Sequence, residues 1–405
     1  MKVLVYLPEE KLCPKGGPLS VGYYYNEEMK RRGEHTLEFT HVNTKNEEIH
    51  RKGKNITRRL PKWINEIHRT IRHIISRRKF LSGVCYAQTR DFSQYDIIHF
   101  HEAKDMYLER KNLSDYKGIV LYQSHSPLPW GQEQCKDLYR VYHWLIPNME
   151  QRYEEIDRYC FDRADYIIFP CEDAEEPYSD NWPYFKILKN RKKEQFKYIL
   201  TGIMPAFAKL DKSTVLGRYE IPVDDFVISY VGRHNTVKGY DILKEIASKY
   251  FKTDKHAWVV SAGLEAPFTR LKHAHWKEIG FTDDPHSLIS ASDVFVLPNR
   301  VTYFDIVMIE ILSLGKIVIA SRTGGNKYFE KMGVKGILLY DTIDEAVSLL
   351  SKVKSMPPEE RKVLEDGNKE FYTSNLSNKA MYDTYINLLK NIYENKNVRH
   401  IQKRL

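Results

Sequence analysis

Two cations lie five residues apart immediately after a short apolar run. Residues 226–231 read FVISYV, Gly232 follows, and Arg233 and Lys238 come next. A glycine lets the backbone turn sharply after a strand. Fixed Arg and Lys side chains can stabilise the negative charge that develops on a departing diphosphate. Taken alone, the pair is as typical of a solvated strand-to-helix loop as of such a site.

Two carboxylates flank the start of a second apolar segment. Asp305 precedes residues 306–314, which are predicted to be helical, and Glu310 lies within them. Asp305 is either an N-cap of this helix or a ligand-binding carboxylate, and one residue can do both. The backbone N–H groups of Tyr303, Phe304 and Asp305 open the helix, and helix N-termini bind phosphate well.

The elements that position these residues alternate between strand-like and helix-like segments, which predicts parallel βαβ units. The strands are predicted at 2–7, 37–42, 97–100, 119–123, 166–170, 226–231, 257–262, 294–298 and 317–321. Helices are predicted at 23–32, ending at Gly33, and at 240–250, 306–314 and 380–393. We expect two doubly wound domains, at 1–205 and 206–380, and a C-terminal helix, 381–405, that packs back on the first.

Residues 226–325 resemble the donor-binding half of the retaining glycosyltransferases of family four, of the polysaccharide-biosynthesis type. The motifs are VGRHNTVKG at 231–239, IGFTDDPHSLISASDVFVLPN at 279–299 and IEILSLG at 309–315. The resemblance implies the α/β GT-B fold, in which two Rossmann-like domains face one another across a cleft. It covers about a hundred residues strongly and most of the chain loosely.

The resemblance also implies roles for individual residues. Arg233 and Lys238 contact the pyrophosphate, Glu310 binds the two ribose hydroxyls, and the donor's β-phosphate lies near 302–305. The backbone of Ile279 reads the edge of the base, although a plain strand residue is an equal interpretation. Gly16 and Gly17 form a glycine-rich loop near the donor, where a simple turn is the alternative. His125, after the run at 119–123, approaches the reacting sugar, where a hydrogen-bonded structural histidine is the alternative.

One departure from the family pattern concerns the donor sugar. Relatives carry an additional glutamate before the one that matches Glu310, and this sequence has Thr302 near that place. Because that glutamate contacts the sugar, its loss leaves the sugar's identity open. Asp305 is a candidate to supply the absent carboxylate.

The net charge of +9 is concentrated in one segment of the 405-residue chain. Residues 51–80 contain eleven basic residues and one acidic residue, Glu66. A helix beginning at Pro61 carries isoleucines at helical spacing, and such a cationic, amphipathic helix is suited to an anionic membrane surface. The alternative is an ordinary domain helix with a charged outer face. The membrane candidates are Trp63, Arg69, Arg72, Arg77 and Arg78.

Other partners and compartments are constrained by what the sequence lacks. No nucleic-acid-binding motif accompanies the basic charge. The five scattered cysteines predict neither disulfides nor zinc, which fits a reducing compartment. The N-terminal apolar run is too short for a signal peptide, and no run approaches a membrane span. No Asp-x-Asp pair occurs, so we expect no essential metal and no cofactor.

The combined hypothesis is a cytoplasmic, peripherally membrane-associated retaining glycosyltransferase. It would use a nucleoside-diphosphate sugar, most simply a UDP-sugar, and a saccharide or lipid-linked acceptor in surface polysaccharide or glycoconjugate synthesis. One alternative is a catalytically weak GT-B subunit that stabilises a partner transferase. A nucleotide-sugar epimerase or a phosphorylase of the same fold is the other alternative.

Overall fold

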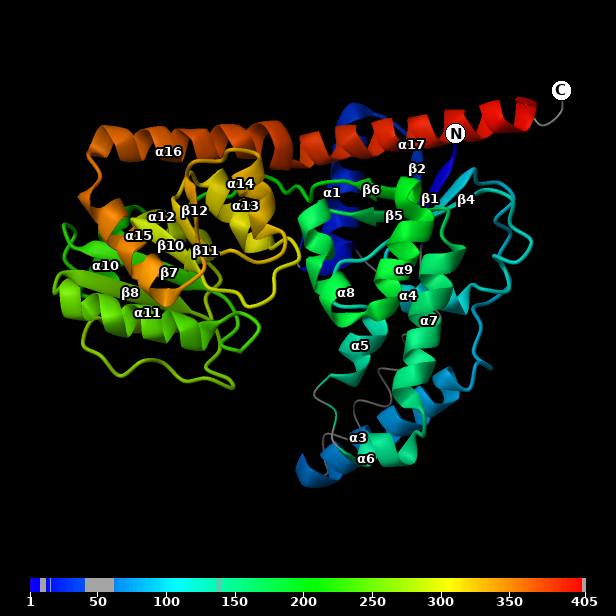
Figure 1. The fold of residues 1–405 in the computed structure, drawn as a ribbon, viewed down its shortest axis with the longest axis horizontal. Coiled ribbons are helices and arrows are strands. Elements are labelled where there is room, and N and C mark those ends of the chain that lie inside the picture. Colours follow the sequence, from blue (N-terminus) through cyan, green and yellow to red (C-terminus); the bar gives the residue numbers. More distant parts are fainter. Residues whose placement is uncertain (8–11, 15, 41–61, 137, 139, 403–405) are drawn as a thin grey trace. The chain divides into compact units, whose positions relative to one another are not determined.

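The computed structural model describes residues 1–7, 12–14, 16–40, 62–136, 138 and 140–402 (Figure 1). For residues 62, 63, 140, 141 and 397–402 only the backbone is described. The internal contacts divide the chain into two compact units. The first unit contains Met1–Phe169, Tyr178–Lys197 and Ile386–Leu405, and the second contains Pro170–Pro177 and Tyr198–Tyr385.

The first unit is built on a six-stranded sheet in the order β2-β1-β3-β4-β5-β6. Neighbouring strands from β2 to β5 pair in parallel. Every residue of β1, β3 and β4 is buried, which explains their continuous apolar runs, because helices cover both faces of a parallel sheet. The strands are β1 Val3–Tyr6, β2 Leu37–Phe39, β3 Ile97–Phe100, β4 Ile119–Gln123, β5 Tyr166–Phe169 and β6 Phe196–Tyr198.

The helices of this part of the chain include one that begins earlier than the sequence predicts. Helix α1 begins at Gly17 rather than at Tyr23, and it ends as predicted at Gly33, which has a φ of 67°. The α-helices are α1 Gly17–Arg32, α3 Lys62–Leu81, α4 Ala103–Leu108, α5 Trp130–Cys135, α6 Arg140–Leu145, α7 Met149–Arg163, α8 Glu176–Asn181 and α9 Pro183–Lys192.

The second unit contains another six-stranded sheet, in the order β12-β11-β10-β7-β8-β9, and all its pairings are parallel. This is the Rossmann order, in which the chain reverses direction across the sheet between the first and the fourth strand. Here those strands are β7 and β10. The strands are β7 Phe226–Val231, β8 Ala257–Ala262, β9 Trp276–Gly280, β10 Val294–Leu297, β11 Val318–Ser321 and β12 Ile337–Tyr340.

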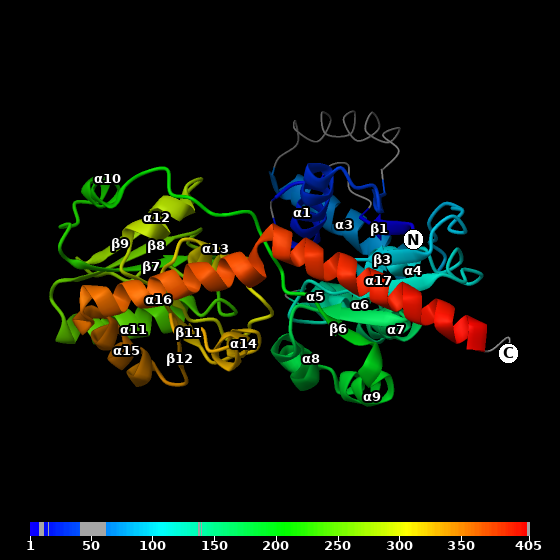
Figure 2. The same ribbon diagram turned by 90° about the horizontal axis from the view of Figure 1, so that it is seen from above.

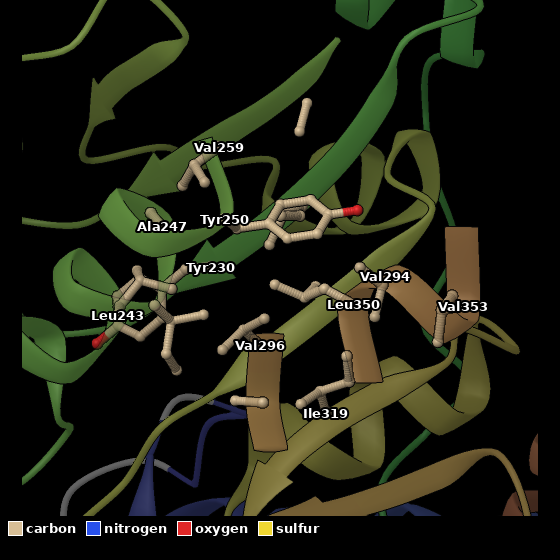
Figure 3. Close-up of a cluster of buried hydrophobic side chains, with 14 of the residues drawn as sticks. Tyr230, Leu243, Ala247, Tyr250, Val259, Val294, Val296, Ile319, Leu350 and Val353 are labelled. Carbon is tan, nitrogen blue, oxygen red and sulfur yellow. The ribbon is translucent and has the colours of Figure 1, made fainter. Parts of the chain in front are cut away.

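Alternate side chains of β7 enter two different cores of the second unit. Phe226, Ile228 and Tyr230 pack with α11 and α15, a cluster drawn in Figure 3, whereas Val227 packs with α10 and α12. Figure 2 shows these helix pairs on opposite faces of the sheet. The helices are α10 Lys212–Arg218, α11 Tyr240–Thr253, α12 Pro285–Ala291, α13 Ile306–Ser313, α14 Asn326–Lys331, α15 Ile343–Ser355, α16 Pro358–Phe371 and α17 Asn378–Gln402.

Two segments belong to a different unit from the residues that precede them in the sequence. Residues Pro170–Pro177 belong to the second unit, where the Glu176 carboxylate accepts a hydrogen bond from the Gly324 backbone N–H at 3.1 Å and pairs with Lys327. Helix α17 belongs to the second unit up to Tyr385 and to the first unit from Ile386 onward. The internal contacts of the C-terminal part of this helix are therefore with the first unit. No helix in the described part of the chain is long and apolar enough to cross a bilayer.

Candidate active site

The loops that follow β7 and β10 meet at the point where the strand order reverses. A Cβ atom at Gly239, which has a φ of 62°, would lie 1.8 Å from the carbonyl oxygen of Pro298. The backbone N–H of Arg300 donates to the carbonyl of Val237 at 2.9 Å. Open α/β sheets bind ligands at this place, at the carboxyl ends of their strands. The two loops that the sequence singled out therefore form one site.

Arg233 and Lys238 reach this site in different electrostatic states. The side chain of Arg233 is exposed, and it makes no hydrogen bond or ion pair with any residue that the structure describes. Lys238 is mostly buried, and its Nζ lies 2.6 Å from Oδ2 of Asp305. The site therefore presents one cation that is available to an incoming anion and one that is already neutralised.

Asp305 occupies the N-cap position of α13, but its carboxylate makes no capping hydrogen bond. The carboxylate instead accepts hydrogen bonds from Lys238 and from the side-chain amide of Asn299. Asp305 is therefore the N-cap residue of the helix by position, as one interpretation predicted, but its side chain does not cap the helix. Asn299 was missed by the sequence analysis, although its place directly after the strand-ending Pro298 is a usable signal.

The backbone at 302–304 is held in place by close packing. Cβ atoms at Gly324 and Gly325 would each lie 2.0 Å from a carbonyl oxygen, of Thr302 and Tyr303 respectively. The Thr302 side chain is 1% exposed, and its hydroxyl lies 3.2 Å from the Thr323 hydroxyl. Thr302 is therefore part of the buried support of the loop, and its hydroxyl does not face solvent.

The start of α13 offers backbone donors rather than side chains. The side chains of Tyr303 and Phe304 are 8% and 7% exposed, and the Phe304 ring stacks on Phe329. Within the described residues, the N–H groups of Phe304 and Asp305 donate no hydrogen bond. Such N–H groups at a helix N-terminus suit a phosphate oxygen.

Glu310 and Ile279 lie further along the same unit. Oε1 of Glu310 lies 3.3 Å from Nε2 of His286, a residue of α12 that the sequence analysis did not identify. Both side chains are partly exposed, so Glu310 is accessible to hydroxyl donors such as those of a ribose. The side chain of Ile279 packs partly buried against the core between α10 and α12.

The first unit brings three imidazoles together at the carboxyl ends of β3 and β4. Nδ1 of His101 and Nε2 of His125 are 2.8 Å apart, so one ring donates and the other accepts. The ring centroids of His99 and His101 are 4.1 Å apart. Burial lowers the pKa of all three histidines, so the rings are neutral at pH 7. His99 and His101 were missed, although the sequence HFH at a strand end signals them.

The glycine-rich loop has the backbone that only glycine adopts readily. Gly16 and Gly17 have φ values of 71° and 48°, and they form the N-terminus of α1. A side chain at either position would therefore strain the turn. The loop leads from β1 to α1, and β1 and β3 are the neighbouring strands at which the first sheet reverses its order.

The exposed side of the basic helix α3 differs in composition from the prediction. Arg77 is directed toward its own domain, where it donates a hydrogen bond of 2.7 Å to the carbonyl of Gln134. Ile67, Ile71 and Ile75 are 52%, 51% and 62% exposed. The side chain of Trp63 and residues 51–61, which carry part of the basic segment, lie outside the described residues.

The described residues contain no group of three or more His, Cys, Asp or Glu side chains arranged to hold a metal ion. The expectation that no metal is essential stays a prediction.

The comparisons with known proteins agree with this geometry. Residues 211–371 match the family model "Glycosyl transferases group 1". No curated protein matches the chain. Solved structures with the same fold include the sucrose-phosphate synthase of Thermosynechococcus elongatus, with a TM-score of 0.61, 14% identity and coverage of 97% of this chain and 99% of that chain.

Two further structures share the fold. HepE from Anabaena, solved in complex with UDP-glucose, has a TM-score of 0.58 and 14% identity, with coverage of 96% of this chain and 100% of that chain. WaaG, a glycosyltransferase involved in lipopolysaccharide biosynthesis, has a TM-score of 0.57 and 13% identity, with coverage of 95% and 99%. The chain has the GT-B fold, and with its group 1 domain it is a glycosyltransferase enzyme.

Proposed function

We propose that the protein is a retaining glycosyltransferase of family four that uses a UDP-sugar. The proposal rests on two kinds of anion-binding group: the exposed guanidinium of Arg233 and the backbone N–H groups at the start of α13. They belong to the loops after β7 and β10, which are in contact at Gly239. Together they match the charge and the hydrogen-bond acceptors of a diphosphate. The binding of UDP-glucose by HepE supports the choice of nucleotide.

In this scheme Arg233 stabilises the diphosphate as the bond to the sugar breaks. Lys238 changes partner: it separates from Asp305 and contacts the leaving group, which frees the Asp305 carboxylate for the sugar's hydroxyls. The acceptor hydroxyl attacks from the side that the leaving group vacates, so the configuration of the sugar is retained. The departing phosphate takes the hydroxyl proton, and no protein base is required.

The first unit is proposed to bind the acceptor. His125, the partly exposed member of the three neutral imidazoles, can offer a hydrogen bond without a net charge, which suits hydroxyl groups better than phosphates. The GT-B fold of WaaG, which takes part in lipopolysaccharide synthesis, supports a saccharide or lipid-linked acceptor.

Helix α3 is proposed to dock on an anionic membrane surface at the cytoplasmic side. Its three exposed isoleucines recur every four residues and so share one face. Arg72, Arg78 and Lys79 are exposed around that face. The one acid of the helix, Glu66, lies on the far side of the helical projection. Exposed apolar residues bordered by cations are the composition of helices that lie in a lipid interface.

A radiolabelled-donor assay tests the enzymatic proposal. UDP-sugars are incubated with the protein, with and without lipid extracts as acceptor, and both transfer and slow donor hydrolysis are measured. Transfer with retained anomeric configuration is expected. A protein that binds UDP-sugars but neither transfers nor hydrolyses them would instead be the catalytically weak partner subunit.

A further inference from the structure

A carboxylate and an imidazole are buried together under the loop that carries Arg233 and Lys238. The side chains of Glu278, on β9, and His234, next to Arg233 in the chain, are 2% and 0% exposed. Oε1 of Glu278 lies 3.7 Å from Nε2 of His234. Within the described residues, neither group has any other ion-pair partner. A buried ionisable pair without a fixed countercharge is costly, so its presence calls for an explanation.

Tyr240 connects the two groups and fixes the far end of the same loop. Its ring stacks on the His234 ring with centroids 3.8 Å apart and planes inclined by 11°. Its hydroxyl donates to Oε2 of Glu278 at 2.7 Å. Tyr240 begins α11 directly after Gly239, so the loop is anchored at His234 and again at its exit. In addition, the Tyr230 hydroxyl donates to the Arg233 carbonyl at 2.9 Å.

The hydrogen-bonding capacity of Glu278 and His234 is only partly used. Oε1 of Glu278 and Nδ1 of His234 have no hydrogen-bond partner among the described residues. Burial lowers the pKa of His234 to about 4 and raises the pKa of Glu278 above its ordinary value. At neutral pH the imidazole is therefore uncharged, and the site contains a carboxylate that can still accept a proton.

We propose that Glu278 and His234 are positioning residues that hold the Arg233–Lys238 loop and together bind one additional proton when a nucleoside diphosphate sugar occupies it. The inference rests on the proposed donor site. A nearby anion favours the protonated form of both groups, neutral for the carboxyl and cationic for the imidazole. Because the two groups interact, the proton belongs to the pair rather than to either residue. Donor binding is thereby coupled to pH.

The other titratable groups around the pair do not substitute for it. Burial raises the pKa of the Tyr230 and Tyr240 hydroxyls, which stay protonated. The Glu265 carboxylate acts on His234 from the loop after β8, but it is exposed and accepts a hydrogen bond from Arg270. Glu265 therefore offers a matched control.

Calorimetry of UDP-glucose binding without acceptor tests the inference. Titrations at pH 6 in two buffers that differ in ionisation enthalpy report the protons taken up. UDP-glucose is a suitable probe because its diphosphate is a diester and does not titrate near neutral pH. We expect an uptake of about half a proton or more, decreasing toward pH 8.

Variants locate the proton. Glu278→Gln keeps an oxygen that can accept the Tyr240 hydrogen bond, so binding should persist while the uptake falls close to zero. His234→Gln should also remove the uptake and should weaken UDP-glucose binding by about tenfold through loss of the stack. Glu265→Gln removes an exposed carboxylate outside the pair and should leave most of the uptake in place.

The failures are distinguishable. If wild-type protein binds UDP-glucose with no proton uptake, the inference is wrong and the proposed donor site stands; this holds even if a variant fails to fold. If wild-type protein binds no nucleotide sugar, the proposed function fails first and the inference fails with it. If the proton uptake survives in both Glu278→Gln and His234→Gln, or if it disappears in Glu265→Gln, the proton binds elsewhere. Either result overturns the assignment.

Discussion

The two units place chemically opposite groups at equivalent ends of their parallel sheets. In the second unit the loops after β7 and β10 carry charge: a free guanidinium at Arg233 and an ammonium–carboxylate pair at Lys238 and Asp305. In the first unit the corresponding ends of β3 and β4 carry neutral, buried imidazoles. The two sheets thus differ in the groups beside their carboxyl ends: partly exposed charges in the second unit and uncharged, mostly buried rings in the first. The residues that follow the strands supply this difference in charge, and the two sheets also differ in strand order.

Removing the free cation is the strongest test of the charged site. Arg233→Ala should lower kcat/KM by about 100- to 1,000-fold, because a charge-stabilising donor to the leaving group is lost. Steady-state transfer assays measure the effect. Arg270→Ala removes another exposed cation of the same unit and should change kcat/KM little. Near-normal turnover in Arg233→Ala would show that this residue takes no part in the chemistry.

Charge on the first unit is predicted to act on membranes rather than on the donor. Reversing Arg72, Arg78 and Lys79 to Glu should weaken binding to anionic vesicles by about 100-fold, since each basic residue at such a surface contributes about 1 kcal/mol. Vesicle co-sedimentation at low and high salt measures it. Reversing the exposed Lys335, Lys352 and Lys362 of the second unit changes the net charge equally and should have little effect. Wild-type protein that ignores anionic vesicles at low salt would make α3 an ordinary domain helix.

The buried imidazoles should make the first unit sensitive to acid. The pKa of His99 is lowered to about 3, so the unfolded chain takes up a proton below its ordinary pKa of about 6.5 and the native state does not. Stability is therefore lost as the pH falls from about 6.5 toward 3, by about 2 kcal/mol for His99 at pH 5. Urea unfolding of wild-type protein and His99→Gln at pH 7 and pH 5 measures this. An equal pH dependence in both proteins would contradict the assignment.

The smallest effect is expected at the ribose contact. Glu310→Gln should weaken UDP binding by about tenfold and should change kcat little, because the contact is present in the ground state and in the transition state alike. Calorimetry with UDP and a KM measurement test this. His286→Gln removes the histidine beside Glu310 but not the carboxylate, and it serves as the comparison. An unchanged UDP affinity in Glu310→Gln would exclude the ribose role.

The sequence by itself determined the class of fold and singled out the loops that follow β7 and β10. Runs such as 97–100, 119–123, 226–231 and 257–262 match the observed strands because fully buried parallel strands must be continuously apolar. Gly33 and Gly239 stand where the backbone needs a positive φ, which leaves a mark in the sequence. The strands β6 and β9 were missed because β6 has only three residues and β9 carries mixed side chains, and the apolar β12 was missed as well.

Only the tertiary structure decided which side chains meet. Asn299 and Lys238 hold the Asp305 carboxylate across two loops, and His101 bonds His125 from the neighbouring strand, over separations of up to 67 residues. The inward turn of Arg77 and the burial of Glu278 beside His234 likewise depend on packing between elements. Local sequence patterns report backbone propensity and burial periodicity, whereas these contacts follow from strand order and loop geometry, which no local pattern contains.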